Sequence, residues 1–242
     1  MTYGLLTNQG ERDHNEDFIG RALRGNRAVF ILADGLGGHG KGEVASRSVV
    51  ENVISHYKEG EQVPELSECI EFAQQKLLEQ QITEHMTYGM KTTLVMLELD
   101  GKRMRWAHIG DSRAYHFRKR KVIARTLDHS VPQMLVATGQ IKEKEIRFHE
   151  DRNRLLRVMG TEWSQPQYVV SDWKEMNEGD AFLLCSDGFW EWIQEKYMEK
   201  ALKKAKTAQN WLDLMEERIR KNGTGKDMDN YSAIAVWHEK GD

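Results

Sequence analysis

Short apolar runs that end in acidic or glycine-containing turns recur along much of the chain. The run Ala28–Ala33 is continuous and stops at Asp34-Gly35, which predicts a strand buried on both faces. Further strand patterns cover Thr92–Leu99, Arg103–Ile109, Arg113–Phe117, Gln167–Val170, Ala181–Cys185 and Tyr231–Trp237. Asp100-Gly101 predicts a tight turn between the first two of these.

Apolar residues follow helical spacing in two other parts of the chain. Between Ala45 and Tyr57 they recur every four residues, and Pro64 opens a second helix whose apolar stripe runs from Leu66 to Leu77. Two later helices are predicted over Glu195–Lys204 and Ala208–Arg220. Helices in two blocks among hairpin-linked strands indicate a layered α+β domain.

One long segment fits neither period. Residues Leu127–Gly160 are polar, irregular and at most weakly helical. Segments of this length usually carry function or mobility rather than core. The chain has 242 residues, a length that suits a single large domain over residues 1–242.

Composition and charge narrow the class of protein. The formal net charge is -3, which gives no reason to expect nucleic acid or a membrane as the main partner. Cys69 and Cys185 lie in unrelated patterns and are expected to be reduced core residues. No signal peptide or membrane-spanning run is visible, so we expect a cytoplasmic protein, and we expect a monomer.

Several apolar strands end in an aspartate followed by a small residue. Asp34, Asp111 and Asp187 occupy such positions, Asp229 precedes the last strand, and Glu16-Asp17 lie near the start of the chain. Short carboxylates are hard oxygen ligands that suit Mg²⁺ or Mn²⁺. Each pair taken alone is more often a plain turn. Several carboxylates at one place would repel strongly without a cation, which favours a metal site.

These residues resemble the motifs of the metal-dependent protein phosphatases, the protein phosphatase 2C or PPM family, and in particular its bacterial serine/threonine phosphatases. The opening motif is Gly10–Asp17, GERDHNED. The remaining motifs follow in the family's order: ADGLGGH at 33–39, KTT at 91–93, GDSR at 110–113, DHS at 128–130, NRLLRVMG at 153–160, SDG at 186–188 and DN at 229–230. Each motif is weak alone, but eight in sequence span nearly the whole chain.

The resemblance implies a four-layer αββα sandwich of two mainly antiparallel sheets, with Mn²⁺ or Mg²⁺ at one end. Asp34 would bridge two core ions, Asp187 and Asp229 would complete one, and Glu16 with the Gly35 carbonyl the other. Asp111 with Asp187 would hold a third, weaker ion. Asp17 would orient the metal-bridged water, and Arg12 would bind the substrate phosphate.

The function that the resemblance implies is hydrolysis of phosphoserine and phosphothreonine in proteins, partners that a cognate Ser/Thr kinase would produce. Animal members carry a histidine where this chain has Leu36, so the family's proposed acid is absent. His39 is a candidate proton donor, whereas His14 and His129 are better explained as loop-ordering residues.

The segment 128–157 resembles the flap beside the site in bacterial members. Its arginines, Arg147, Arg152 and Arg154, either meet phosphoprotein substrates or form a solvated basic surface.

Two rival functions remain open from the sequence. Gly35–Gly42 nearly spells a nucleotide-binding P-loop, but Gly42 stands where a serine or threonine would contact Mg²⁺. A non-catalytic phosphoprotein-binding module of the same fold is the other alternative, and it would be expected to have lost metal ligands, which this chain retains.

Overall fold

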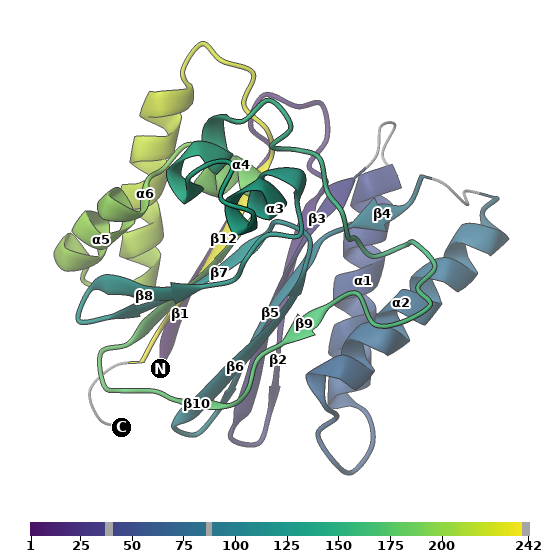
Figure 1. The fold of residues 1–242 in the computed structure, drawn as a ribbon. Helices are drawn as coiled ribbons and strands as arrows, with labels where there is room; N and C mark the ends of the chain where they lie inside the picture. The colour runs from purple at the N-terminus through teal and green to yellow at the C-terminus, as the bar shows by residue number, and fades with distance from the viewer. Residues whose placement is uncertain (37–40, 86–88, 239–242) are drawn as a thin grey trace.

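Two β-sheets pack face to face in the computed structural model, which describes residues 1–36, 41–85 and 89–238 (Figure 1). One sheet has the order β1 (Thr2–Asn8), β12 (Tyr231–Trp237), β11 (Ala181–Cys185), β7 (Arg113–Arg118), β8 (Lys121–Arg125). The other has the order β10 (Lys174–Glu175), β6 (Arg103–Ile109), β5 (Leu94–Asp100), β3 (Arg27–Leu36), β2 (Asp17–Arg24), with β4 (Lys91–Thr92) beside β3 and β9 (Val169–Val170) beside β6. Neighbouring strands are antiparallel throughout both sheets.

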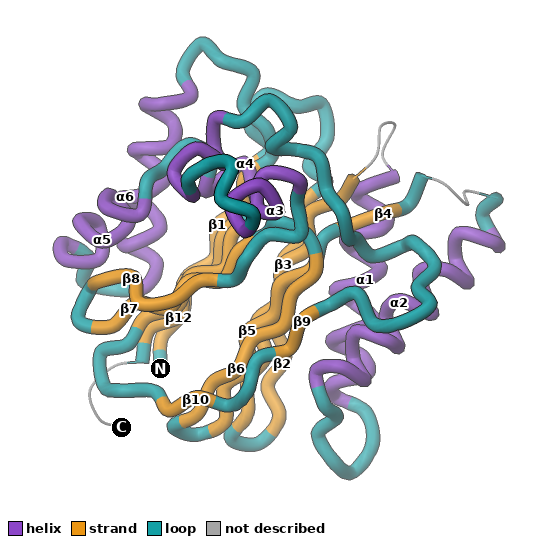
Figure 2. The backbone as a smooth tube through the Cα atoms, in the orientation of Figure 1, coloured by secondary structure: helices purple, strands orange, loops and turns teal. Residues whose placement is uncertain are grey.

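Helices cover the outer face of each sheet, as Figure 2 shows with strands in orange and helices in purple. Helices α1 (Lys41–Lys58) and α2 (Leu66–Thr83) lie on the second sheet, and α5 (Glu195–Lys204) and α6 (Ala208–Gly223) lie on the first. The short helices are α3 (Val131–Ala137), the 3-10 helix η1 (Glu143–Phe148) and α4 (Asp187–Trp190). The predicted αββα sandwich is therefore confirmed. Within the three described ranges, each helix is too short or too polar to span a lipid bilayer.

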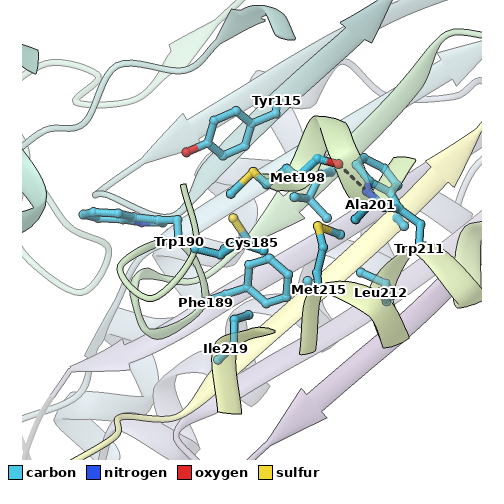
Figure 3. Close-up of a cluster of buried hydrophobic side chains, with 14 of the residues drawn as sticks. Tyr115, Cys185, Phe189, Trp190, Met198, Ala201, Trp211, Leu212, Met215 and Ile219 are labelled. Atoms are coloured by element: carbon cyan, nitrogen blue, oxygen red, sulfur yellow. Dashed lines mark hydrogen bonds between the residues drawn. The ribbon is translucent and has the colours of Figure 1, made fainter. Parts of the chain in front are cut away.

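Each interface between layers has its own apolar core. Figure 3 shows the one beneath α5 and α6, where Trp211 packs among methionines and donates its indole N–H to the Met198 carbonyl at 3.0 Å. A second core lies between the other sheet and α1–α2. The third fills the seam between the two sheets and includes Phe30, Leu32, Phe182, Leu184 and Ile234.

That inter-sheet seam turns polar at one end, because side chains alternate along a strand. On β3 the seam-facing series Phe30, Leu32 continues to Asp34. On β11 the series Phe182, Leu184 continues to Ser186. Apolar packing thus gives way to carboxylates and hydroxyls at the same end of both sheets, and this end carries the candidate site.

The structure departs from the predicted elements at several places. Strands β1 and β2 were not predicted. The segment 127–160, expected to be at most weakly helical, contains both α3 and η1. The strand expected over Thr92–Leu99 is divided at Thr93, whose backbone N–H donates to the Asp34 carbonyl at 2.8 Å and whose hydroxyl accepts from the Asp34 N–H at 3.0 Å. Thr93 therefore bonds to the end of β3 instead of continuing either ladder.

A buried charge network supports the opposite end of the second sheet. Glu98 is fully buried and accepts hydrogen bonds from the Tyr57 hydroxyl at 2.9 Å and from Arg105 Nε at 2.7 Å. Burial, followed by the charge of Glu98, raises the pKa of Tyr57. Arg105 is itself almost fully buried, and Glu98 is its buried carboxylate partner, whereas its second partner, Glu65, is mostly exposed.

The Glu98→Ala variant should therefore lose much of the protein's stability. Leaving the buried Arg105 with only the exposed Glu65 as a partner should lower the free energy of unfolding by about 3–5 kcal/mol. Arg103→Ala is the control, because its ion pair with Asp100 is half exposed and should contribute less than about 1 kcal/mol. Urea unfolding measures both, and similar losses in the two variants would contradict the role given to Glu98.

Candidate functional site

One cavity of about 500 Å³ gathers acidic residues from distant parts of the sequence. Its lining comprises Arg12, Asp13, His14, Glu16, Asp34, Gly35, Leu36, Asp111, Asn153, Leu155, Asp187, Asp229 and Asn230. Every residue predicted to bind metal lies in this lining, and so does Arg12. Asp17, the remaining predicted site residue, is buried and paired in register with Asp34 but is not part of this lining.

Ends of strands and starts of helices place these carboxylates. Asp34 is near the end of β3, and Asp187 is the first residue of α4, directly after β11. Asp111 follows β6, and Asp229 lies two residues before β12. Gly188 lets α4 start against the neighbouring chain, since a Cβ there would collide with the Asn230 carbonyl. The site therefore rests on rigid elements of both sheets.

Asp17 is held by a hydroxyl and has one free oxygen. Its Oδ2 accepts a hydrogen bond from the Ser186 hydroxyl at 2.7 Å. Its Oδ1 is buried and has no hydrogen-bond partner in the described part of the chain. A buried carboxylate oxygen without a donor is costly unless a ligand or water supplies one.

The carboxylates of the cluster raise one another's pKa values. Burial, with repulsion from neighbouring aspartates, raises the pKa of Asp17 to about 7 and that of Asp187 to about 6. The pKa values of Asp34 and Asp111 are raised well above the usual range for the same two reasons, burial being the larger. The protein alone therefore stabilises the charged cluster poorly.

Arg12 supplies part of the missing positive charge. Its Nε and Nη2 donate to the two oxygens of Asp229, each at 3.1 Å, and its Nη1 lies 3.5 Å from Asp227 Oδ2. These carboxylates raise the pKa of the guanidinium. Arg12 is thus at the rim of the cavity, exposed to solvent and engaged with a predicted ligand rather than pointing away.

The donor set suits a hard divalent cation. Carboxylates and the Gly35 carbonyl offer only oxygen ligands, the type that Mg²⁺ and Mn²⁺ prefer. Across residues 1–36, 41–85 and 89–238, no three histidine, cysteine, aspartate or glutamate side chains stand as a closed metal-binding group. The oxygen-only donor set of the cavity nevertheless fits such a cation.

The loop that carries Asp111 is fastened to α4. The Trp190 indole N–H donates to the Asp111 carbonyl at 3.0 Å, and the Arg113 guanidinium lies 3.5 Å above the Trp190 ring. Arg113 makes a bidentate pair with Asp128, at 2.8 and 2.6 Å. Arg113 therefore pairs with Asp128 and not with Asp111, its near neighbour in the GDSR motif. The GDSR and DHS motifs are instead joined by a buried Arg113–Asp128 ion pair.

A histidine near the site holds a loop in place in this structure. His129 exchanges backbone and ring hydrogen bonds with Gly110 and stacks on His108 with ring centroids 4.7 Å apart. Burial lowers the pKa of His129 to about 3, so its ring is neutral at physiological pH. His39, the candidate proton donor, lies outside the described residues, as do Gly37, Gly38 and Gly40 of the segment that resembles a P-loop.

The three flap arginines differ in their surroundings. Arg147 is half-buried and donates to the carbonyls of Trp190 and Ile193, the latter at 2.9 Å, so it anchors the flap to the end of α4. Arg152 forms an ion pair with Glu191 at 3.0 Å, and Arg154 is largely exposed. Neither alternative describes Arg147, because its donors are bound to carbonyls and to Glu195 within the protein.

Sequence reasoning missed several residues that shape the site. Ser186, Trp190 and Glu191 all lie within or beside the predicted SDG motif, yet nothing in their spacing shows what they contact. Glu191 is one helical turn beyond Asp187, and burial with repulsion from Asp187 raises its pKa to about 7. The one available signal for Glu191 in the sequence was its position four residues after a predicted ligand, a spacing that places two side chains on the same face of a helix.

Comparisons of this chain with known proteins all indicate the same family. The sequence model described as protein phosphatase 2C matches residues 8–231. The serine/threonine phosphatase stp of Listeria monocytogenes is 33% identical over 236 residues, which covers 93% of this chain and 90% of that protein. The serine/threonine protein phosphatase PstP of Mycobacterium tuberculosis is 31% identical over 228 residues, covering 92% of this chain. The chain spans only 43% of the length of PstP.

Solved structures agree with this likeness. The serine/threonine phosphatase Stp1 of Staphylococcus aureus superposes with a TM-score of 0.89 at 30% identity, covering 100% of this chain and 96% of that one. The catalytic domain of PstP, in complex with two manganese ions, gives a TM-score of 0.80 at 28% identity and covers 98% of each chain.

The raised carboxylate pKa values predict an unusual pH dependence for the metal-free protein. Asp17 and Asp187 have folded-state pKa values of about 7 and about 6, above their ordinary value of 3.8. Between the ordinary and the raised pKa values, the folded state binds more protons than the unfolded state, so deprotonation favours unfolding. In chelator, the contribution of the cluster to the free energy of unfolding should fall as pH rises from about 4 to about 7.

Urea unfolding of the protein with chelator and with excess Mn²⁺ measures this effect. Bound cations should remove the decline by replacing the lost protons, and Asp17→Asn should reduce it in chelator. A metal-free protein whose stability rises steadily over this pH range, with no change in Asp17→Asn, would show that the cluster is not strained by its charge.

Proposed function

The chain belongs to the protein phosphatase 2C family, and we propose that it is a metal-dependent serine/threonine protein phosphatase that removes phosphate from phosphoserine and phosphothreonine in proteins. The observation that carries this proposal is the single cavity lined by Glu16, Asp34, Asp111, Asp187 and Asp229, with Arg12 at its rim. The complete carboxylate set counts against a non-catalytic module of the same fold.

The proposed ligand assignment follows the cavity lining. Asp34, Asp187 and Asp229 would hold one Mn²⁺ or Mg²⁺ ion, and Asp34, Glu16 and the Gly35 carbonyl would hold a second. The two manganese ions bound by PstP support this number. Such ions, when bound, provide a strong nucleophile at neutral pH and stabilise charge on the phosphoryl oxygens.

The side chains of the protein position the reacting groups. The Arg12 guanidinium, held at the rim by Asp229, is placed to turn towards a phosphoryl group and bind two of its oxygens. Asp17 Oδ1, which has no donor among the described residues, would accept a hydrogen bond from the attacking water and orient it. The new bond joins the water oxygen to phosphorus, the bond from phosphorus to the serine or threonine oxygen breaks, and that oxygen takes up a proton.

Substrate and location follow from the same proposal. The proposed substrates are phosphoproteins made by a Ser/Thr kinase, and the similarity to serine/threonine phosphatases of two bacteria supports this substrate class. Cys69 and Cys185 are free and buried, which suits a reducing, cytoplasmic compartment.

Hydrolysis of a phosphothreonine peptide and of p-nitrophenyl phosphate tests the activity. We expect turnover with Mn²⁺ and none after exhaustive chelation. Asp34→Ala and Asp187→Ala should each reduce turnover by orders of magnitude, because loss of a core ligand removes nucleophile generation and charge stabilisation together. Activity that survives chelation, or near-wild-type turnover in either folded variant, would refute the mechanism.

Asp111 is proposed to hold a third, weaker ion together with Asp187. Few protein ligands and reluctant dehydration make such a site weak. Asp111→Ala should leave the two tight ions bound, abolish one weak site in a calorimetric metal titration, and reduce turnover of phosphopeptides. Asp13→Ala is a matched control, since Asp13 lines the same cavity but is not a proposed ligand. Unchanged weak binding together with unchanged turnover in Asp111→Ala would exclude the third ion.

A further inference from the structure

A second groove, of about 570 Å³, lies beside the candidate site. It is bounded by the end of η1, the chain after α4, the start of α5 and the end of α6. The lining residues that the argument uses are Phe148, Arg152, Trp192, Tyr197, Arg218 and Lys226. No step of the proposed hydrolysis uses this groove.

The groove and the candidate site share a wall. Arg152 lines the groove, whereas the next residue, Asn153, lines the site. Glu191 lines the groove and follows the proposed ligand Asp187 by one turn of helix. The Arg152–Glu191 ion pair, at 3.0 Å, forms the ridge between the two hollows. A chain bound at the site therefore reaches the groove by crossing this one ridge.

The groove is positively charged and aromatic. Arg218 lies 4.9 Å from the ring centroid of Tyr197, and Lys226 lies 4.8 Å from that of Trp192. Neither cation has a carboxylate partner among the described residues. Glu191 is the one acid among the described lining residues, and Arg152 already neutralises it. Phe148 is 75% exposed at the groove edge, although an isolated aromatic ring usually prefers burial.

We propose that this groove binds acidic side chains of the phosphoprotein substrate, at positions that flank the phosphoserine or phosphothreonine. The inference rests on the proposed function, because the occupant is the same chain whose phosphate enters the candidate site. Arg218 and Lys226 attract carboxylates, while the aromatic walls limit water around the ion pairs and strengthen them. The groove thereby selects acidic phosphoproteins over neutral ones.

The geometry sets the distance between phosphate and acid. One turn of helix from Asp187 to Glu191 spans about 6 Å, and the groove lies beyond it. An extended peptide advances about 3.3 Å per residue. The selected acidic residues should thus lie roughly two to five positions from the phosphorylated one.

Kinetics on matched peptides test the proposal. The substrates are phosphothreonine peptides with glutamates at positions two to five on the N-terminal side, on the C-terminal side, or replaced by glutamine. The wild-type protein with Mn²⁺ should have a higher kcat/KM for one of the glutamate peptides than for its glutamine counterpart. In Arg218→Glu/Lys226→Glu that ratio should fall by about tenfold, mostly through KM.

The double variant Lys203→Glu/Lys204→Glu is the control, since it makes the same change in net charge at exposed positions of α5 outside the groove. Its ratio should match that of the wild type. Equal kcat/KM values of the wild type for the glutamate and glutamine peptides would overturn the groove proposal while leaving phosphatase activity intact. A fall in the ratio of the control variant as large as that in the groove variant would do the same. Absence of turnover on every peptide would instead refute the proposed function itself.

Discussion

Repulsion among carboxylates at one end of the inter-sheet seam is the constraint on which the site depends. Asp17, Asp34, Asp111 and Asp187 are brought together by the same strands whose apolar residues fill the seam. Their raised pKa values show that the protein has not compensated the charge internally. A divalent cation held by these carboxylates would complete the compensation at the place where the proposed chemistry needs it.

Neighbouring elements hold the cluster in place despite this repulsion. Ser186 bonds Asp17, Thr93 bonds both backbone groups of Asp34, and Trp190 fastens the Asp111 loop to α4. Helix α4 also receives the flap through Arg147. The same short helix thus connects the proposed metal ligands, the flap and the cationic groove. The substrate contacts proposed for the groove would therefore be held in a fixed position relative to the cavity.

Local pattern determined much of the architecture. Continuous and alternating apolar runs predicted β3, β6, β7, β11 and β12, and four-residue spacing predicted the covering helices, because those periods follow from backbone geometry alone. The acidic strand ends also marked the residues that the structure gathers in one cavity. A short carboxylate at the end of an apolar strand is visible in the sequence, since it interrupts a pattern that is otherwise uniform.

Contacts between distant segments were decided only by the tertiary structure. Nothing local distinguishes Arg113 pairing with Asp128 from Arg113 pairing with Asp111, because the choice depends on where the chain returns fifteen residues later. Glu98 appears in the sequence as one polar residue in a strand, yet Tyr57 and Arg105 bury it fully. The sequence by itself determined which residues could bind a cation or a phosphate, whereas packing decided which of them share a cavity and which charges they meet there, since electrostatic interactions depend on distance in space and not on separation along the chain.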